Sequence, residues 1–173
     1  MKHTFEIKKS RIEGRGAFAT QPIKKGELIC RTQGDEMSIS ELQRKYKEGT
    51  ERWTDPFQVR DLEYLDLDEP YVFINHSCDP NATVIGFNEL IALKQIETGE
   101  EIIYDYSLTE WTDDKSWQGY DEWSMECRCG YSSCRKQINE FRFLPKDIQE
   151  KSVKLNLVQD HIFNKYKNAI MKH

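Results

Sequence analysis

The stretch FINHSCDPN occupies residues 73–81, and the stretch EEIIYDY follows at residues 100–106. A third element, CRCGYSSC, lies at residues 127–134 and places three cysteines within eight residues. The first two elements contain an Asn-His pair and tyrosines, which are residue types able to bind a ligand or assist a reaction. The cysteines of the first and third elements have a spacing typical of metal ligands.

Length and composition indicate one folded domain. The chain has 173 residues, of which 38% are hydrophobic and 12% aromatic, enough to bury a substantial core. No apolar run approaches the ~20 residues that a membrane span requires, and the N-terminus lacks the apolar core of a signal peptide. We therefore expect a soluble, intracellular protein without a membrane partner.

The charge balance is mildly acidic. The formal net charge is −5, with 30 acidic against 25 basic residues. A nucleic-acid-binding protein usually carries a basic surface that releases counterions from phosphates, so no direct nucleic-acid binding is expected. An acidic surface is more compatible with a basic partner, such as a peptide rich in lysine and arginine.

Short strands separated by turns dominate the first two thirds of the chain and predict a mostly β fold. The two glycines of the EGRG run at residues 13–16 indicate a tight turn. Ser38 and Glu41 form a capping box that predicts a short helix to about residue 48, followed by a polar connector over residues 49–56. Strands are expected at residues 4–8, 17–20, 27–31, 57–60, 71–74, 83–87 and 90–94.

The C-terminal third has a different character. Residues 109–125 contain three tryptophans and a tyrosine without strand or helix periodicity, which predicts a long, adaptable loop. Residues 146–171 are predicted to be helical, with one apolar face. Packing of this face on the domain is favoured over binding of a partner. The face is formed by Leu155, Val158, Ile162, Tyr166 and Ile170.

The cysteines alone predict a structural zinc site. Cys127, Cys129 and Cys134 offer three thiolates, and Cys78 or Cys30 is available as the fourth. Zn²⁺ in structural sites takes four such ligands in a tetrahedron and keeps no open position for catalysis. In a chain without a signal peptide, tightly clustered cysteines bind metal more often than they form disulfides.

In this order the three elements resemble a SET domain followed by its cysteine-rich post-SET tail, over roughly residues 6–138. The resemblance implies a SET β-fold of small, mostly antiparallel sheets with a pseudoknot core. It also implies three regions: a SET domain over residues 1–108 with a variable insert at 38–70, a Trp-rich loop and zinc-binding segment over 109–138, and a C-terminal helical extension over 139–173.

The resemblance also implies an activity, because this family transfers methyl groups from S-adenosylmethionine (SAM) to lysine side chains of proteins. The positions that match the family's SAM-binding residues are Gly14, Arg15, Gly16, Asn75, His76 and Tyr106. Tyr106 matches the catalytic tyrosine, and Tyr104 matches a position that tunes the number of methyl groups added. A tyrosine at this second position implies mono- or dimethylation.

By the same resemblance Cys78 is the fourth zinc ligand beside Cys127, Cys129 and Cys134. Three residues depart from the family's pattern. Thr32 stands where many relatives have a channel tyrosine, Val72 replaces an arginine, and Lys136 replaces a glycine. The aromatic residues between Trp111 and Trp123 are candidates for replacement channel walls, although simple packing also explains them.

The expected function is therefore SAM-dependent methylation of a lysine in a histone or another basic protein. A catalytically silent SET module that binds a peptide is the alternative, favoured by Thr32 and Val72 and disfavoured by the intact Asn75, His76 and Tyr106. A zinc-stabilised nucleic-acid-binding module is a third possibility that the acidic charge disfavours. The sequence assigns neither the oligomeric state nor the place of action, which could be the cytoplasm, the nucleus or a host cell.

Overall fold

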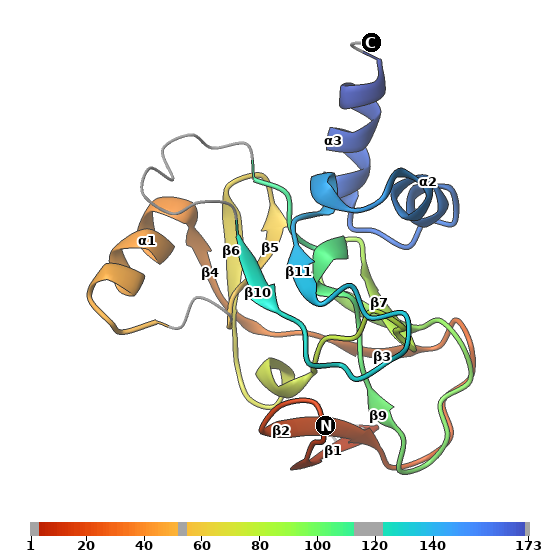
Figure 1. The fold of residues 1–173 in the computed structure, drawn as a ribbon. Helices are drawn as coiled ribbons and strands as arrows, with labels where there is room; N and C mark the ends of the chain where they lie inside the picture. The colour runs from red at the N-terminus through yellow and green to blue at the C-terminus, as the bar shows by residue number, and fades with distance from the viewer. Residues whose placement is uncertain (1–3, 52–54, 113–122, 172–173) are drawn as a thin grey trace.

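The computed structural model describes residues 4–51, 55–112 and 123–171. Over these ranges the fold is mostly β, as predicted, with α-helices at one side and near the C-terminus (Figure 1). The strands are β1 (Phe5–Lys9), β2 (Arg15–Ala19), β3 (Leu28–Arg31), β4 (Gly34–Ser38), β5 (Phe57–Arg60), β6 (Glu63–Leu67), β7 (Ala82–Ile85), β8 (Glu89–Ala92), β9 (Glu101–Ile102), β10 (Ser124–Glu126) and β11 (Gln137–Asn139). The helices are α1 (Ile39–Lys47), α2 (Lys146–Lys154), α3 (Asp160–Ile170) and the 3-10 helices η1 (Tyr71–Phe73), η2 (Tyr106–Leu108) and η3 (Phe141–Phe143). None of the described helices is long and apolar enough to cross a bilayer.

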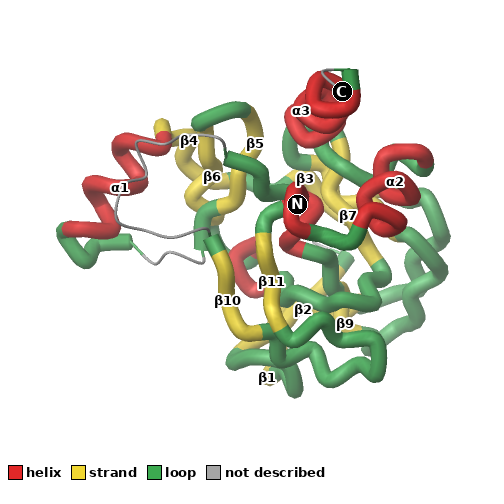
Figure 2. The backbone as a smooth tube through the Cα atoms, turned by 45° about the horizontal axis from the view of Figure 1, so that its top comes forward, coloured by secondary structure: helices red, strands yellow, loops and turns green. Residues whose placement is uncertain are grey.

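The described strands form small antiparallel sheets. Three sheets have three strands each, in the spatial orders β1-β2-β9, β3-β8-β7 and β4-β6-β5, and β10 pairs with β11 alone. Figure 2 shows β10 and β11 side by side, with α1 on the opposite side of the molecule from α2 and α3. Each sheet is too small to be stable alone, so the sheets must bury their apolar faces against one another.

Two segments far apart in the sequence lie parallel at the centre of the fold. His76 forms a parallel bridge with Tyr104, with the Tyr104 N–H donating to the Asn75 carbonyl at 3.2 Å. The Ser77 N–H in turn donates to the Tyr104 carbonyl at 3.0 Å. This pairing brings the 73–81 stretch against the 100–106 stretch, as the pseudoknot expectation requires.

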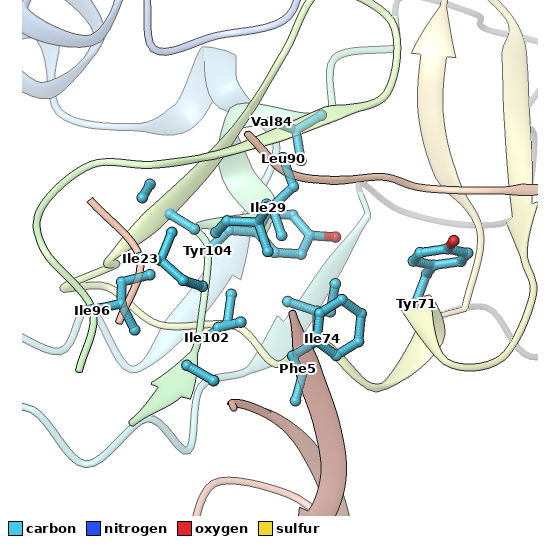
Figure 3. Packing of buried hydrophobic residues seen from close by; sticks show 14 of the residues in the cluster. Phe5, Ile23, Ile29, Tyr71, Ile74, Val84, Leu90, Ile96, Ile102 and Tyr104 are labelled. Atoms are coloured by element: carbon cyan, nitrogen blue, oxygen red, sulfur yellow. The ribbon is translucent and has the colours of Figure 1, made fainter. Parts of the chain in front are cut away.

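The main core lies between these paired segments and the sheets. Ile23, Ile96 and Ile102 are almost completely buried. Figure 3 shows them gathered with Ile29 and the ring of Tyr104. Burial of each such side chain contributes about 1.5–3 kcal/mol. Tyr104 is thus anchored in the main hydrophobic core.

The capping box before α1 is confirmed on its N-cap side. The Ser38 hydroxyl accepts the Glu41 N–H at 3.3 Å, and α1 ends at Lys47. The prediction of a strand at residues 71–74 is wrong. The Tyr71 N–H donates to Asp68 and the Ile74 N–H to Tyr71, which closes the 3-10 turns of η1.

The prediction of one continuous apolar face over residues 146–171 is also wrong in part. The helix is interrupted after α2, because Asn156 adopts a left-handed conformation with φ 53° and the Leu157 N–H donates to the Ser152 carbonyl. Val158 and Ile162 pack in a second core cluster around Phe141, as expected of packing. Leu155 and Ile170, at the break and at the end of α3, are more than half exposed.

Most of the predicted loop over residues 109–125, including Trp117 and Tyr120, lies outside the described residues. The same holds for residues 52–54 of the predicted polar connector. The loop prediction was too long at its end, since Ser124 and Met125 belong to β10. At its start, Trp111 is buried and stacks on Phe141 with ring centroids 5.8 Å apart. Packing therefore explains this tryptophan.

Candidate active site and metal centre

A cleft of about 540 Å³ opens between the N-terminal turn, the segment around Asn75 and the β10-β11 ribbon. This volume falls in the range of sites for small molecules and cofactors. The cleft combines apolar walls with charged groups at its rim. Its lining consists of Ile12, Glu13, Gly14, Arg15, Asp55, Val72, Phe73, Asn75, His76, Tyr106, Met125, Glu126, Arg128 and Ile138.

Asn75 fixes the glycine turn at one end of this cleft. Its side-chain amide donates to the carbonyls of Arg15 at 2.9 Å and Glu13 at 3.3 Å, and to Glu101 Oε1 at 2.8 Å. The second Glu101 oxygen accepts from the Ser10 hydroxyl at 3.0 Å. Sequence reasoning missed Glu101 as a site residue, since an acidic residue in a two-residue strand has no distinguishing pattern of its own.

The two glycines of the turn serve different purposes. Gly14 has φ +40°, a backbone conformation that side chains disfavour. Gly16 lies inside β2 with an ordinary φ, but an added Cβ would be 2.8 Å from Glu101 Cδ and 3.1 Å from the Asn75 amide nitrogen. Gly16 therefore permits the close approach of β2 to the Asn75–Glu101 pair.

His76 connects the cleft with the cysteines. Its Nδ1 accepts the Tyr106 N–H at 3.2 Å, so its proton is on Nε2, which lies 3.4 Å from Cys78 Sγ. Burial lowers the pKa of His76 to about 4. The ring is therefore neutral at physiological pH. The His76 side chain therefore contacts both the Tyr106 backbone and Cys78.

Tyr106 and Tyr104 meet beneath the cleft. Their ring centroids lie 4.8 Å apart, and the Tyr106 hydroxyl donates to the Ile74 carbonyl at 2.8 Å. Burial raises the pKa of both hydroxyls, so both tyrosines are neutral. A neutral hydroxyl held in this way can orient a substrate group by a hydrogen bond without adding charge.

A second, much smaller pocket, named the channel from here on, adjoins the cleft. It has a volume of only about 10 Å³, close to that of one water molecule, and it shares Asp55, Val72 and Tyr106 with the cleft lining. Its remaining lining residues are Pro56, Phe57, Leu67, Ile74, Tyr104, Thr109, Glu110 and Trp123. This lining includes Trp123, one of the candidate replacement walls, and does not include the buried Thr32.

Glu110 is a buried acid in this channel that the sequence analysis did not identify. Glu110 is buried, and its carboxyl Oε1 accepts the Gln58 N–H at 2.9 Å. Burial raises its pKa from 4.5 to about 8, and Glu140 adds to this effect. A strongly perturbed carboxyl in a cleft or channel is a candidate functional group.

The four predicted zinc ligands come together. The Sγ atoms of Cys78, Cys127, Cys129 and Cys134 all lie within 4.8 Å of one another, with 3.6 Å between those of Cys78 and Cys127. Tetrahedral zinc with bonds of about 2.3 Å needs sulfur atoms about 3.8 Å apart, so the donor set fits this metal. Cys30 lies outside the cluster, and burial raises its pKa to about 12.

Backbone groups of the tail support this cysteine cluster. The Arg135 N–H donates to Cys78 Sγ at 3.4 Å, and the Lys136 N–H donates to Cys134 Sγ at 3.3 Å. The Arg135 guanidinium also binds the buried Asp105 carboxylate at 2.7 Å. The segment after the cysteines is therefore tied to the residue between the two tyrosines of the site.

Antiparallel sheets, a glycine-lined cleft and a four-cysteine cluster that joins Cys78 to three cysteines of the tail are the features expected of the SET-domain class. The sequence matches the SET domain over residues 14–107, and the chain belongs to this family.

Relatives of this chain carry the same class of domain. It is 28% identical to "Histone-lysine N-methyltransferase trithorax" of Drosophila virilis, over 76% of this chain and 4% of that protein. It is also 28% identical to "Histone-lysine N-methyltransferase 2D" of Homo sapiens, over 80% of this chain and 3% of that protein. The chain thus spans only a small fraction of these relatives.

Among solved structures, the fold is similar to the methyltransferase domain of human histone-lysine N-methyltransferase SETMAR. The TM-score is 0.63 at 25% sequence identity, covering 81% of this chain and 59% of that chain. This similarity confirms the fold class expected from the sequence.

Proposed function

We propose that this protein transfers methyl groups from SAM to a lysine side chain of a histone or another basic protein. The observation that carries the proposal is that a cofactor-sized cleft and a narrow channel share a wall, which Tyr106 forms together with Asp55 and Val72. A methyl donor in the cleft and a lysine in the channel would reach each other at this point. Membership of the SET family and the named activities of the relatives support the same reaction.

The cleft fits the chemistry of SAM. Its rim carries acidic Glu13 and basic Arg15 and Arg128, which suit the ammonium and carboxylate groups of an amino acid. Its apolar residues Ile12 and Ile138 suit a flat aromatic base. In this proposal Gly14, Arg15, Gly16, Asn75, His76 and Tyr106 bind the cofactor, which supplies an electrophilic methyl group when bound.

Tyr106 would act mainly by orientation. Lysine in water has a pKa of ~10.4 and must lose a proton before its nitrogen can attack. The channel removes water from the ammonium group and so lowers its pKa. The Tyr106 hydroxyl, which donates to the Ile74 carbonyl, can also accept a hydrogen bond and align the amine.

Tyr104 would limit the number of methyl groups. The residue is buried, and its ring lies against Tyr106 on the channel lining. In a channel this narrow, a tyrosine leaves less room for a methylated amine than a phenylalanine would. We therefore infer mono- or dimethylation, and mainly trimethylated product from the unmodified protein would contradict this.

Zinc held by Cys78, Cys127, Cys129 and Cys134 would be structural. Four thiolates close the coordination sphere, so no position remains for a substrate. The metal would tie the tail, including the cleft residue Arg128, to the central segment at Cys78. In the proposed three-region organisation, residues 1–108 hold the reaction centre. Residues 109–138 add the zinc-binding segment, and residues 139–173 form a C-terminal extension that packs on the domain.

The partner in this proposal is a lysine-containing peptide rather than a nucleic acid. The net charge of −5 favours a basic segment, as in histone tails. If a histone is the substrate, the protein would act where chromatin is accessible, in its own nucleus or in that of a host cell.

A methyl-transfer assay tests the proposal. Zinc-loaded protein is incubated with methyl-labelled SAM and a panel of core histones, nucleosomes and whole-cell lysate, beside Tyr106→Phe. We expect label on a protein band with the unmodified protein and a loss of at least ~100-fold with Tyr106→Phe. Absence of label together with absence of SAM binding by calorimetry would favour a silent peptide-binding module.

A further inference from the structure

Glu110 is positioned rigidly at the channel. Its carboxyl Oε1 accepts the Gln58 N–H at 2.9 Å, and its backbone carbonyl accepts the Phe141 N–H at 2.7 Å. Gln58 in turn accepts the Trp111 N–H at 2.8 Å through its side-chain oxygen. The backbone of Glu110 is thus held by the C-terminal extension, and its carboxyl group is held by the strand β5.

The second carboxyl oxygen, Oε2, has no hydrogen-bond partner among the described residues. Glu110 lines the channel together with Tyr104 and Tyr106, so this oxygen is available to a group that enters there. An ammonium group is the natural partner.

The charged surroundings do not already supply that partner. Lys165 of α3, whose charge acts to lower the pKa of Glu110, binds Asp61 at 2.7 Å and the Trp111 carbonyl at 2.7 Å. Glu140 is engaged by Arg142 at 2.8 Å. The other titratable groups around Glu110 are Asp55, Tyr104 and Tyr106 on the channel lining, Tyr64 on β6, and His161 of α3, which faces the preceding residue Thr109.

We propose that Glu110 accepts the proton of the target lysine, an inference that rests on the proposed methyltransferase function. One N–H bond of the lysine ammonium breaks, an O–H bond forms on the Glu110 carboxylate, and the electron pair stays on the nitrogen. The product is a neutral amine beside a neutral carboxylic acid. The acid then returns its proton to water.

The physical reason is the low polarity of the channel. An ion pair in such a site pays a large desolvation penalty, whereas the neutral pair does not. Burial raises the pKa of Glu110 to about 8 and lowers that of an entering ammonium from ~10.4, so the two values converge. Proton transfer between groups of similar pKa has a small free-energy cost.

The first test needs no substrate protein. Zinc-loaded protein with ¹³C-labelled glutamate carboxyls is titrated by NMR, and the Glu110 signal is identified by its absence in Glu110→Gln. This variant keeps both the size of the side chain and the oxygen that accepts the Gln58 N–H. n-Butylammonium serves as a probe of the lysine side chain, and n-butanol serves as its uncharged control.

We expect the Glu110 signal to titrate near pH 8 alone and at least one pH unit higher with saturating n-butylammonium, because the neutral amine leaves its proton on the carboxyl group. n-Butanol should leave the midpoint in place. A midpoint that the amine does not move would overturn the inference.

The second test uses the labelled protein band from the methyl-transfer assay. The wild-type kcat/KM should rise about tenfold per pH unit below pH 8. Glu110→Gln should lower kcat about 100-fold and abolish this dependence, while KM changes little. Glu150→Gln, on the exposed surface of α2, should behave as wild type.

The two tests separate the possible failures. Labelled substrate with an unchanged pH profile in Glu110→Gln would overturn the inference and leave the methyltransferase function standing. No labelled substrate, despite an amine-dependent rise in the midpoint of the Glu110 signal, would contradict the proposed function and leave Glu110 as a carboxyl group that takes a proton from bound amines.

Discussion

The side-chain amide of Asn75 lies 2.8 Å from Oε1 of Glu101, and this hydrogen bond joins the central segment to β9. The same amide holds the glycine turn through two carbonyls, and the same carboxylate binds Ser10 at the end of β1. Three elements of the cleft therefore depend on one pair. Damage to this pair should change cofactor binding before it unfolds the protein.

Substitution Gly16→Ala should weaken SAM binding. The added methyl group would overlap the Glu101 carboxylate, which cannot move without breaking its bonds to Asn75 and Ser10. We expect a loss of about tenfold in affinity, equivalent to ~1.4 kcal/mol, measured by calorimetry. Gly49→Asn is the control, because nothing lies within 4 Å of a Cβ there and asparagine tolerates its left-handed φ of +68°. Equal affinities for the two variants would contradict this reading of Gly16.

Substitution Asn75→Asp should destabilise the turn more strongly. It replaces a donor by a second carboxylate facing Glu101 and the carbonyls of Glu13 and Arg15. The expected loss in free energy of unfolding is about 2–4 kcal/mol, from the unmade hydrogen bonds and the like charges.

The double variant Asn75→Asp with Glu101→Gln provides the matched control for this pair. The new amide can donate to the new carboxylate, so part of the stability should return. Chemical denaturation of the four proteins gives the coupling energy. Additive effects would show that the two side chains do not act as a pair.

Much of this site could be predicted from the sequence because its residues occur in compact motifs. The glycine turn, Asn75, His76, Tyr106 and the four cysteines all stand in such runs. Folding brings the runs together. The structure adds the contacts that no run contains, such as the bond from Asn75 to the backbone 60 residues earlier in the chain.

Other features depend on distant contacts and left no pattern in the sequence. Glu110 becomes unusual only because Gln58, Phe141 and the channel surround it. The break after α2 depends on the left-handed Asn156, whereas the apolar periodicity continues across it. The strand expected at residues 71–74 was wrong, because apolar residues in a 3-10 turn resemble those in a buried strand.

Removal of the metal should release the tail from the central segment. With Cys134→Ser, or with a strong zinc chelator, the remaining thiols cannot close a tetrahedron. We expect about one equivalent less of bound zinc by mass spectrometry, and faster hydrogen exchange over residues 123–139 than over β1 and β2. Cys30→Ser is the control, because Cys30 lies outside the cluster. Unchanged exchange in the tail would contradict a metal-held segment.

Substitution Lys136→Gly should stabilise the protein. Lys136 adopts φ +67° while its N–H binds Cys134 Sγ and its carbonyl accepts the Cys127 N–H. A left-handed lysine costs roughly 1–2 kcal/mol relative to glycine. Glycine also makes the unfolded chain more flexible, which lowers the stability of the folded state and offsets part of this gain. We expect a gain of about 0.5–1 kcal/mol by chemical denaturation with zinc bound. Lys146→Gly, at the start of α2, should destabilise instead, since helical glycine is unfavourable.

Stability should fall with rising pH because of Glu110. Its pKa rises from 4.5 in the unfolded chain to about 8 in the fold, mainly through burial, so the folded state binds the proton more tightly between these values. Its contribution to stability is therefore complete below pH 4.5 and is lost as the pH rises through 8, with a slope approaching ~1.4 kcal/mol per unit. His76 and His161, whose pKa values burial lowers to about 4, act in the opposite direction below pH 6.5.

Chemical denaturation between pH 6.5 and 8.5 should thus show the wild type losing stability relative to Glu110→Gln, which cannot ionise. Parallel curves for the two proteins would show that Glu110 has an ordinary pKa in the fold.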